Sequence, residues 1–353
     1  MMRTTLGTLF SLLLALPAAS SPLDRQGPQP PPPPPTSRIR EHFRERYQAA
    51  RQGPEVTERF SRSVRLGRNG AFDIVNIAGD ITVTGGGGDE VRIEAVKRVR
   101  HRDSAEAKAQ LESLQIEVME LSNRVEVRTV YPRQGRNISA AVDYTITLPA
   151  GAATSIRTVS GDVRVTNVRG ELRAESVSGN VVASAATRLS RVKSVSGDVR
   201  VSDASTEGEA TVNTVSGNLT ARSLKARSLD LGSVSGDVSL TDVECERADV
   251  KSVSGNIEYS GPLARNGRYH MNSHSGVLRL AIAGNTGFEL DATTFSGSVR
   301  SDIPLTLRIG PKGVRSNNRL PPPMNRSIRG SFGDASAIVA LQSFSGDIVV
   351  TRR

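Results

Sequence analysis

Apolar and polar residues alternate in short blocks that recur along the second half of the chain. Each block surrounds Val-Ser-Gly-Asp-Val or a close variant of it. The steps between successive motif glycines from Gly161 to Gly297 are 18, 18, 20, 19, 19, 21 and 21 residues, and a further copy surrounds Gly346. A motif that returns at such a period predicts a stacked repeat.

Within one repeat, the residues two and four positions after the glycine are mostly apolar, as are those seven and five positions before it. This is strand spacing, so we expect a short strand on each side of the glycine. An apolar residue also stands two positions before the glycine, as at Val159, Val177 and Phe344. A straight strand turns positions minus five and minus two to opposite faces, so burial of both predicts a bulge or turn between them.

These blocks predict an all-β fold, a parallel β-solenoid (β-helix) with coils of about 18–21 residues and a glycine at each corner. Five buried apolar side chains per coil contribute roughly 1.5–3 kcal/mol each, whereas ordering about 19 residues costs roughly 1–2 kcal/mol per residue. One coil is therefore unstable alone, and stability requires stacked coils that pair their backbones with both neighbours.

The residue after the glycine alternates between Asp and Asn, which allows two interpretations. The column either binds a metal ion or substrate, or bonds nearby backbone at a turn, with asparagine separating carboxylates that would stand ~4.8 Å apart. We favour the turn, because aspartates on every second coil are too far apart to share a calcium ion. The predicted structural corner residues are Gly161, Asp162, Gly179, Asn180, Gly197, Asp198, Gly217, Asn218, Gly236, Asp237, Gly255, Asn256, Gly346 and Asp347.

Hydroxyl residues form two further columns, Ser or Thr three positions before the glycine and Ser one position before it. Such ladders either bind ice or a glycan, or simply fit a tight corner. We favour the corner here too.

Residues 1–20 have the pattern of a secretory signal peptide: a positive start at Arg3, an apolar core from Leu6 to Leu16, and small residues at 18–20. The apolar run is too short to span a membrane, and no later stretch is suited to spanning one. We therefore expect export to the periplasm, the cell surface or the medium, with no transmembrane segment after signal cleavage.

A Pro-rich linker and a short basic helix are expected over residues 21–62. Prolines dominate residues 28–35 and predict an extended spacer. Residues 37–52 have Ile39, Phe43 and Tyr47 on one helical face. This helix either lies on a membrane or packs against the open end of the solenoid.

Residues 63–150 predict an N-terminal β-rich cap that covers the edge of the first coil. Strands are expected near residues 91–99, 116–121, 125–130 and 142–148, with a short helix at 103–114 capped by Asp103 or Ser104. The β-solenoid repeats then occupy residues 151–353. They are interrupted by a long loop at 304–333, where proline, glycine and asparagine gather.

The formal net charge of +10 over 353 residues makes anionic partners plausible, either an envelope glycan or a lipid surface, besides an envelope protein. Nucleic acid is not expected, because no binding motif is present and aromatic residues are only 4% of the chain. The single cysteine, Cys245, has no partner for an internal disulfide and is expected to be a small packing or surface residue.

No catalytic, metal-binding or cofactor-binding residues are predicted. Polysaccharide cleavage needs clustered carboxylates, whereas the acids of the corner recur singly in each coil. His270 and His274 are the one close histidine pair. We expect His274 to be buried rather than a metal ligand, because it occupies the apolar column at minus two.

The chain resembles a bacterial family of exported β-strand-repeat proteins, the "putative adhesin" family DUF4097. The resemblance rests on the repeated motif, an early copy at residues 76–81, the lead-in Leu148-Pro149-Ala150-Gly151 and the ending at residues 344–348. It covers roughly residues 63–353. It implies a β-solenoid at the cell envelope without catalytic residues.

The leading hypothesis is an exported, non-catalytic protein that binds an envelope polymer or partner protein in the manner of an adhesin. The alternative is a structural or regulatory envelope scaffold that self-associates, for example by end-to-end stacking, or reports envelope state. A polysaccharide-cleaving β-helix enzyme is the third hypothesis.

Overall fold

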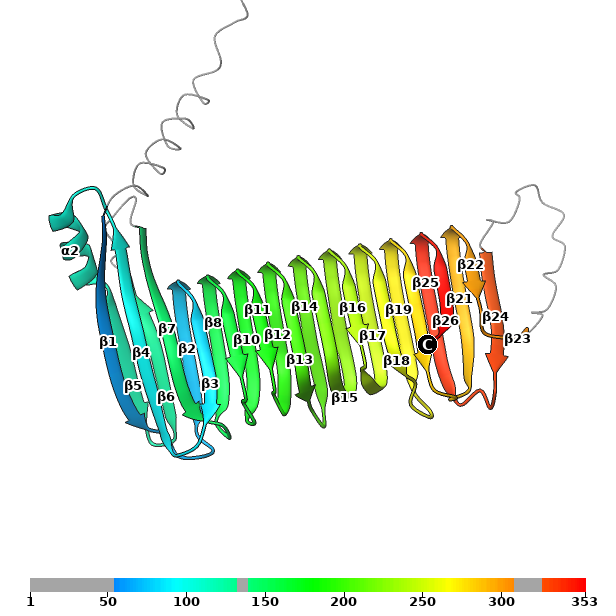
Figure 1. Cartoon of the computed structure of the whole chain (residues 1–353), viewed down its shortest axis with the longest axis horizontal. Helices are drawn as coiled ribbons and strands as arrows, with labels where there is room; N and C mark the ends of the chain where they lie inside the picture. The colour runs from blue at the N-terminus through cyan, green and yellow to red at the C-terminus, as the bar shows by residue number, and fades with distance from the viewer. Residues whose placement is uncertain (1–53, 132–138, 308–325) are drawn as a thin grey trace, which may run out of the picture. The chain divides into compact units, whose positions relative to one another are not determined.

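The computed structural model describes residues 54–131, 139–307 and 326–353, which are strands except for one short helix and the turns between strands. Figure 1 shows these strands stacked side by side in a long row of coils. The all-β class and the solenoid-like repeat are thereby confirmed. The predicted signal peptide, the proline run and the basic helix lie outside the described residues.

Each coil contributes one strand that leads to the corner glycine and one that follows it. The leading strands are β2 (Ala71–Ala78), β8 (Ala153–Ser160), β10 (Glu171–Ser178), β12 (Arg188–Ser196), β14 (Glu209–Ser216), the end of β15 (Leu219–Ser235), β17 (Glu244–Ser254), β19 (Arg268–Ser275), β25 (Ala337–Ser345) and β21 (Phe288–Ser296). The following strands are β3 (Ile81–Gly86), β9 (Val163–Thr166), β11 (Val181–Ser184), β13 (Val199–Ser205), the start of β15, β16 (Val238–Thr241), β18 (Ile257–Pro262), β20 (Leu278–Ala283), β26 (Ile348–Arg352) and β22 (Val299–Ser301).

Equivalent positions of neighbouring coils pair in parallel register. Ala174 of β10 pairs with Ile156 of β8 on one side and with Val192 of β12 on the other. Val181 of β11 likewise pairs with Val163 and Val199. The residues at one motif position therefore form a straight column along the stack.

The columns predicted to form the core are buried at four of the five positions. Residues seven and five before the glycine and two and four after it are buried in nearly every coil, as for Leu172, Ala174, Val181 and Ala183. The fifth apolar inward column comes seven positions after the glycine instead. Its members are Val168, Ala186, Ala204, Leu224 and Val243.

The predicted burial of the column at minus two is wrong. Val159 and its equivalents are close to half exposed, and His274 is exposed as well. The leading strand continues its alternation without the expected bulge, so the inward position next to the corner is minus three. There a small hydroxyl residue such as Ser176 is buried.

The N-terminal cap contains a further coil. β2 and β3 surround Gly79, and they pair directly with β8 and β9 of the Gly161 coil. The remaining cap strands pair antiparallel with one another: β1 (Glu55–Arg65) and β7 (Ser139–Pro149) flank β4 (Glu90–Arg100), and β5 (Gln115–Leu121) pairs with β6 (Arg124–Val130). β6 and β7 join this cap to the Gly79 coil by pairing parallel with β2 and β3. The expected helix is α2 (Ser104–Ser113), and the side chain of its N-cap Asp103 accepts a hydrogen bond from the Ala105 N–H. β1 begins at Glu55, inside the segment assigned to the linker.

At the C-terminal end, the coils do not stack in sequence order. β25 and β26, the last strands of the chain, lie between the Gly276 coil and the Gly297 coil (Figure 1). The expected loop at 304–333 also contains strands. β23 (Thr306–Leu307) and β24 (Arg326–Phe332) pair antiparallel with each other, and β24 pairs with β21. The prediction of a loop there was wrong in part, because pairing with β21 gives the segment a sheet edge to join.

We predict that Gly197→Ala lowers the free energy of unfolding by about 2 kcal/mol or more. A Cβ at this position would lie 2.2 Å from the carbonyl oxygen of Gly179, so the coils would have to separate. Gly208→Ala is the matched control, because a Cβ there meets nothing within 4 Å. Urea unfolding followed by circular dichroism measures both variants. Equal losses would contradict the explanation.

Candidate functional site

The corner of each coil is built on a column of glycines. A Cβ added at any of them from Gly161 to Gly346 would lie 2.0–2.2 Å from the carbonyl oxygen of the glycine in the adjacent coil. The leading and following strands therefore meet at a corner too tight for any side chain. The column sets the spacing of the whole stack.

The hydroxyl residue three positions before the glycine completes this corner from the inside. Ser194 and Thr214 donate to the carbonyl oxygens of Gly179 and Gly197 at 2.9 Å, and Ser176, Ser233, Ser273 and Thr294 make the equivalent bond. These side chains are at most 5% exposed. Their hydroxyl groups are thus part of the corner rather than an array open to a ligand.

The Asp and Asn residues after the glycines form a second ladder. The Oδ1 atom of each accepts a hydrogen bond from the backbone N–H at the same position of the next coil, at 2.8–3.0 Å. The side-chain amides of Asn180 and Asn256 also donate to the carboxylates of Asp162 and Asp237. These hydrogen bonds to nearby backbone are the kind that the turn interpretation of the Asp and Asn column expects. All fourteen predicted corner residues lie along the edge of the stack that contains the glycine column.

Three residues outside the fourteen predicted corner residues terminate these ladders. At the N-terminal end, Asp143 of β7 accepts from the Asp80 N–H through Oδ1 at 3.0 Å. At the other end, Arg326 of β24 donates through Nη1 to the Gly297 carbonyl at 2.9 Å. Ser298 donates its N–H and its hydroxyl to Asp347. Asp143 and Arg326 carry no motif signal, so only the structure reveals their roles.

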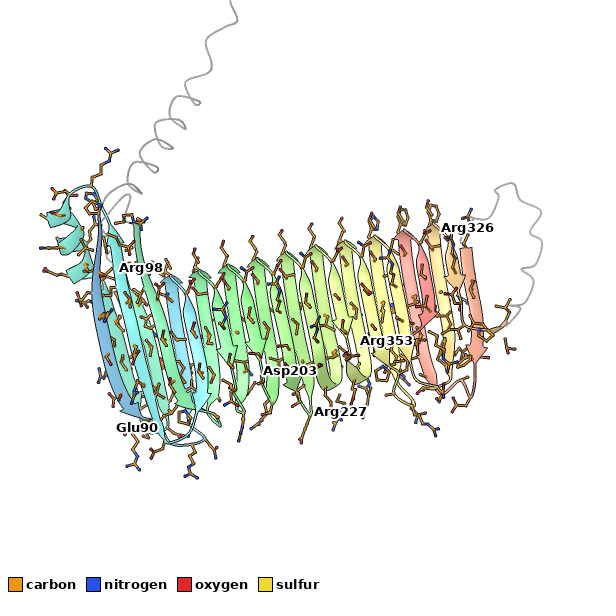
Figure 2. The ribbon with its side chains drawn as sticks, viewed as in Figure 1. Glu90, Arg98, Asp203, Arg227, Arg326 and Arg353 are labelled. Carbon is orange, nitrogen blue, oxygen red and sulfur yellow. The ribbon has the colours of Figure 1, made fainter. Side chains whose placement is uncertain are left out.

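The exposed column at minus two forms a continuous apolar strip, here called the valine ridge. Its aliphatic and phenylalanine members are each 43–50% exposed. In spatial order the ridge consists of Ile77, Val159, Val177, Val195, Val215, Val234, Val253, His274, Phe344 and Phe295. Figure 2 shows side chains standing in a regular row along the edge of the stack that carries Arg326.

The last three members of the ridge are stacked rings. His274 lies 4.8 Å from Phe344, and Phe344 lies 5.0 Å from Phe295, with interplanar angles of 6° and 4°. The ring faces are turned toward one another, so mainly ring edges point outward. His270 instead contacts Asp249 at 3.2 Å. The two histidines therefore belong to different columns of the same face.

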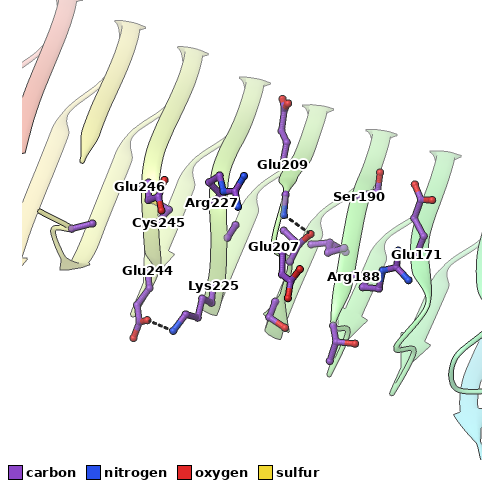
Figure 3. Close-up of a pocket in the computed structure, with 17 residues that line it drawn as sticks. Glu171, Arg188, Ser190, Glu207, Glu209, Lys225, Arg227, Glu244, Cys245 and Glu246 are labelled. Carbon is purple, nitrogen blue, oxygen red and sulfur yellow. Dashed lines mark hydrogen bonds and ion pairs between the residues drawn. The ribbon is translucent and has the colours of Figure 1, made fainter. Parts of the chain in front are cut away.

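A groove with a volume of about 1150 Å³ lies at the edge opposite the glycine corner, where Figure 2 labels Arg227. Its floor includes Leu189, Ala226 and Cys245, which are all buried. Figure 3 shows charged side chains from successive coils around it, with Lys225 bonded to Glu244 at 3.1 Å. The charged lining consists of Glu171, Glu207, Glu209, Glu244 and Glu246 with Arg188, Lys225 and Arg227.

Cys245 does not provide a nucleophile for the groove. Burial raises the pKa of its thiol to about 12, so the thiol stays protonated at neutral pH. The Tyr269 hydroxyl, which donates to the Cys245 carbonyl oxygen at 2.7 Å, belongs to the core beneath it. Cys245 is therefore a packing residue in this structure.

Within residues 54–131, 139–307 and 326–353, no three His, Cys, Asp or Glu side chains are grouped so that they could hold a metal ion. No helix in the same ranges is long and apolar enough to cross a bilayer.

Residues 71–351 match the family described as Toastrack DUF4097, and the chain belongs to this family. The resemblance noted from the sequence is thus confirmed. No curated protein matches the chain.

Several solved structures are similar to this chain at low sequence identity. A "putative lipid binding protein" from Parabacteroides distasonis is 10% identical, with a TM-score of 0.42, and the match covers 84% of this chain and 97% of that one. A "putative adhesin" from Bacteroides fragilis is 12% identical, with a TM-score of 0.40 and the same coverage.

We predict that Asp198→Ala lowers the free energy of unfolding by about 1 kcal/mol, because it leaves the Asn218 N–H without its acceptor at 2.9 Å. Asp198→Asn keeps an acceptor oxygen and should lose much less. Both changes remove the exposed ion pair with Arg200, so this pair does not distinguish them. Urea unfolding of the two variants tests the ladder, and identical losses would refute it.

We predict that the loss of thermal stability at low pH depends in part on Asp347. The Ser298 N–H and hydroxyl, which both bond its carboxylate, hold the pKa of Asp347 below its ordinary value. A lowered folded-state pKa stabilises the fold above the ordinary aspartate range, and this stabilisation is lost as the pH falls through the lowered pKa. Asp347→Asn keeps an acceptor at every pH, so its Tm should fall less on acidification. Parallel Tm curves for the two proteins would contradict this.

Proposed function

We propose that this chain is an exported, non-catalytic parallel β-solenoid, with coils of about 18–21 residues, that binds a partner at the cell envelope through the groove opposite its glycine corner. The observation that carries the proposal is the groove itself. It crosses several coils, from Glu171 to Ala264, and has an apolar floor between charged walls.

The lining favours a protein partner over an anionic polymer. Five glutamates stand against three basic residues in the groove, so its charge is opposite in sign to the net charge of +10 of the whole chain. An anionic glycan or lipid surface would meet repulsion there. A protein surface with mixed charges can match both signs, and such matching contributes to specificity and the rate of association.

We propose that the groove binds its partner without catalysing a reaction. The groove offers carboxylates, but Glu244 is held by Lys225, and Cys245 is protonated beneath the surface. Binding needs no reactive group in the groove, because charged side chains above an apolar floor are sufficient to contact a partner.

The test is a pull-down from isolated envelope fractions with the chain from Ser21 to Arg353, at low and high salt. This range keeps all of β1, most of which a chain beginning at residue 63 would lose. We expect retention of a defined protein band. Retention of a glycan or lipid fraction, lost at high salt, would overturn the preference for a protein partner.

The double variant Arg188→Glu/Arg227→Glu should weaken retention by about tenfold, because it removes two of the three basic residues in the groove. Arg164→Glu/Arg279→Glu is the matched control, since it makes the same change in net charge at exposed positions on the following strands. Equal retention of both variants would rule out the groove as the binding site.

A further inference from the structure

The valine ridge is a larger apolar feature than an isolated chain needs. Nine apolar side chains, each close to half exposed, stand with His274 at ~4.8 Å intervals and offer on the order of 700 Å² of apolar surface. The largest apolar patch of a monomeric protein is roughly 300–600 Å², and each side of a standard interface buries about 800 Å². The ridge thus matches the area that a stable interface needs.

The charged column beside the ridge indicates what covers it. The outward residues six positions before the glycine stack in register on the face that carries the ridge. In spatial order the central five are Arg173, Arg191, Thr211, Asp230 and Asp249. This column has two cations, a neutral residue at its centre and two anions. Its charge changes sign about Thr211.

We propose that the ridge is the interface of a symmetric dimer, in which two copies of this chain pack face to face with their coils running in opposite directions. The two-fold axis runs along the strands, through the Gly217 coil that contains Thr211 and Val215. Each motif column then faces the same column of the other copy, reversed about this coil.

The charges match in this register. Arg173 faces Asp249 of the partner copy, and Arg191 faces its Asp230. Because of the symmetry, each contact occurs twice. The next outward column, four positions before the glycine, adds Glu175 opposite Lys251. Within the described residues, Asp230 forms no salt bridge in its own chain, so the dimer supplies one. The other charged residues of the two columns exchange or share partners, because Arg173, Arg191 and Asp249 already pair with Glu171, Glu175 and Lys251.

Neighbouring registers match less well. If the two-fold axis is shifted by half a coil in either direction, a lysine four positions before its glycine faces a cation at the same motif position of the partner copy. With the axis midway between the Gly217 and Gly236 coils, Lys193 faces Lys251. With the axis midway between the Gly197 and Gly217 coils, Arg157 faces Lys251. The ridge itself tolerates several registers, since identical stacked side chains interdigitate in each of them. The charged columns therefore select one.

Two other occupants fit the ridge poorly. Sugar rings stack on exposed aromatic faces, but the faces of Phe344 are covered by His274 and Phe295. An anionic membrane would attract a basic flank, whereas the flank here carries both signs within one column. A second copy accounts for both the apolar strip and the charge reversal beside it.

The first test is the mass of the full exported chain by analytical ultracentrifugation over a range of concentrations. We expect a monomer–dimer equilibrium, with Asp230→Arg raising the dimer Kd about tenfold or more, because it places two cations face to face. Arg191→Asp/Asp230→Arg exchanges the two charges within each chain and should restore the dimer. Arg164→Asp, on the following strands, is the control and should leave the Kd unchanged.

The second test fixes the register. Val215→Cys places one thiol on each side of the axis, so oxidation should cross-link it rapidly into a covalent dimer. Val159→Cys should not, because it faces His274 of the partner. Cys245 is buried and does not interfere. Circular dichroism checks that each variant keeps its strand content.

A strict monomer at all concentrations would overturn the proposal. So would a dimer that responds equally to Asp230→Arg and Arg164→Asp, or one that cross-links faster through Val159→Cys than through Val215→Cys. Binding of neutral or anionic lipid vesicles by the monomer, lost in Val215→Asp, would assign the ridge to a membrane surface instead.

Discussion

The stacking of each corner glycine on the carbonyl group of the glycine in the adjacent coil is the contact on which the rest of the structure depends. At Gly197, a Cβ would lie 2.2 Å from the Gly179 oxygen, so no other residue fits without separating the coils. The close approach aligns successive coils. It lets buried hydroxyl groups such as that of Ser194 donate to a glycine carbonyl, and side chains such as that of Asn180 accept from the next backbone N–H.

The valine ridge is a geometric consequence of this corner. Because the inward position nearest the glycine is taken by a small hydroxyl residue, the following residue must face out. β-Branched residues favour strands, which explains a valine at this position in part. It does not explain why phenylalanine and histidine replace valine at one end and form a stack. The valine ridge therefore changes along its length from aliphatic side chains to stacked rings.

The sequence was sufficient to predict the repeat, its corner and four of the five core columns, because period and alternation are both local signals. The prediction was wrong at minus two, where the apolar residues are exposed rather than buried. The uneven spacing between minus five and minus two predicts a bulge only if minus two is buried; the strand instead alternates regularly, and its inward residue is the hydroxyl at minus three. No local signal marks Asp143 or Arg326 as ladder ends, or the placement of β25 and β26 between earlier coils. Those features depend on contacts between residues far apart in the chain.

The corner and the groove lie on opposite edges, so their roles are compatible. A two-fold axis along the strands reverses the direction of the coils but leaves each edge where it is. Both grooves of the dimer would then open on the same side, and a partner with two binding segments could engage both with an avidity that one copy lacks. End-to-end growth is less suited to this chain, because its stack ends in antiparallel strands, and the edge strand β1 carries exposed glutamate and arginine side chains. Side-by-side pairing uses the one long surface that the repeat makes uniform, and the reversal of charge about Thr211 gives that surface a single register.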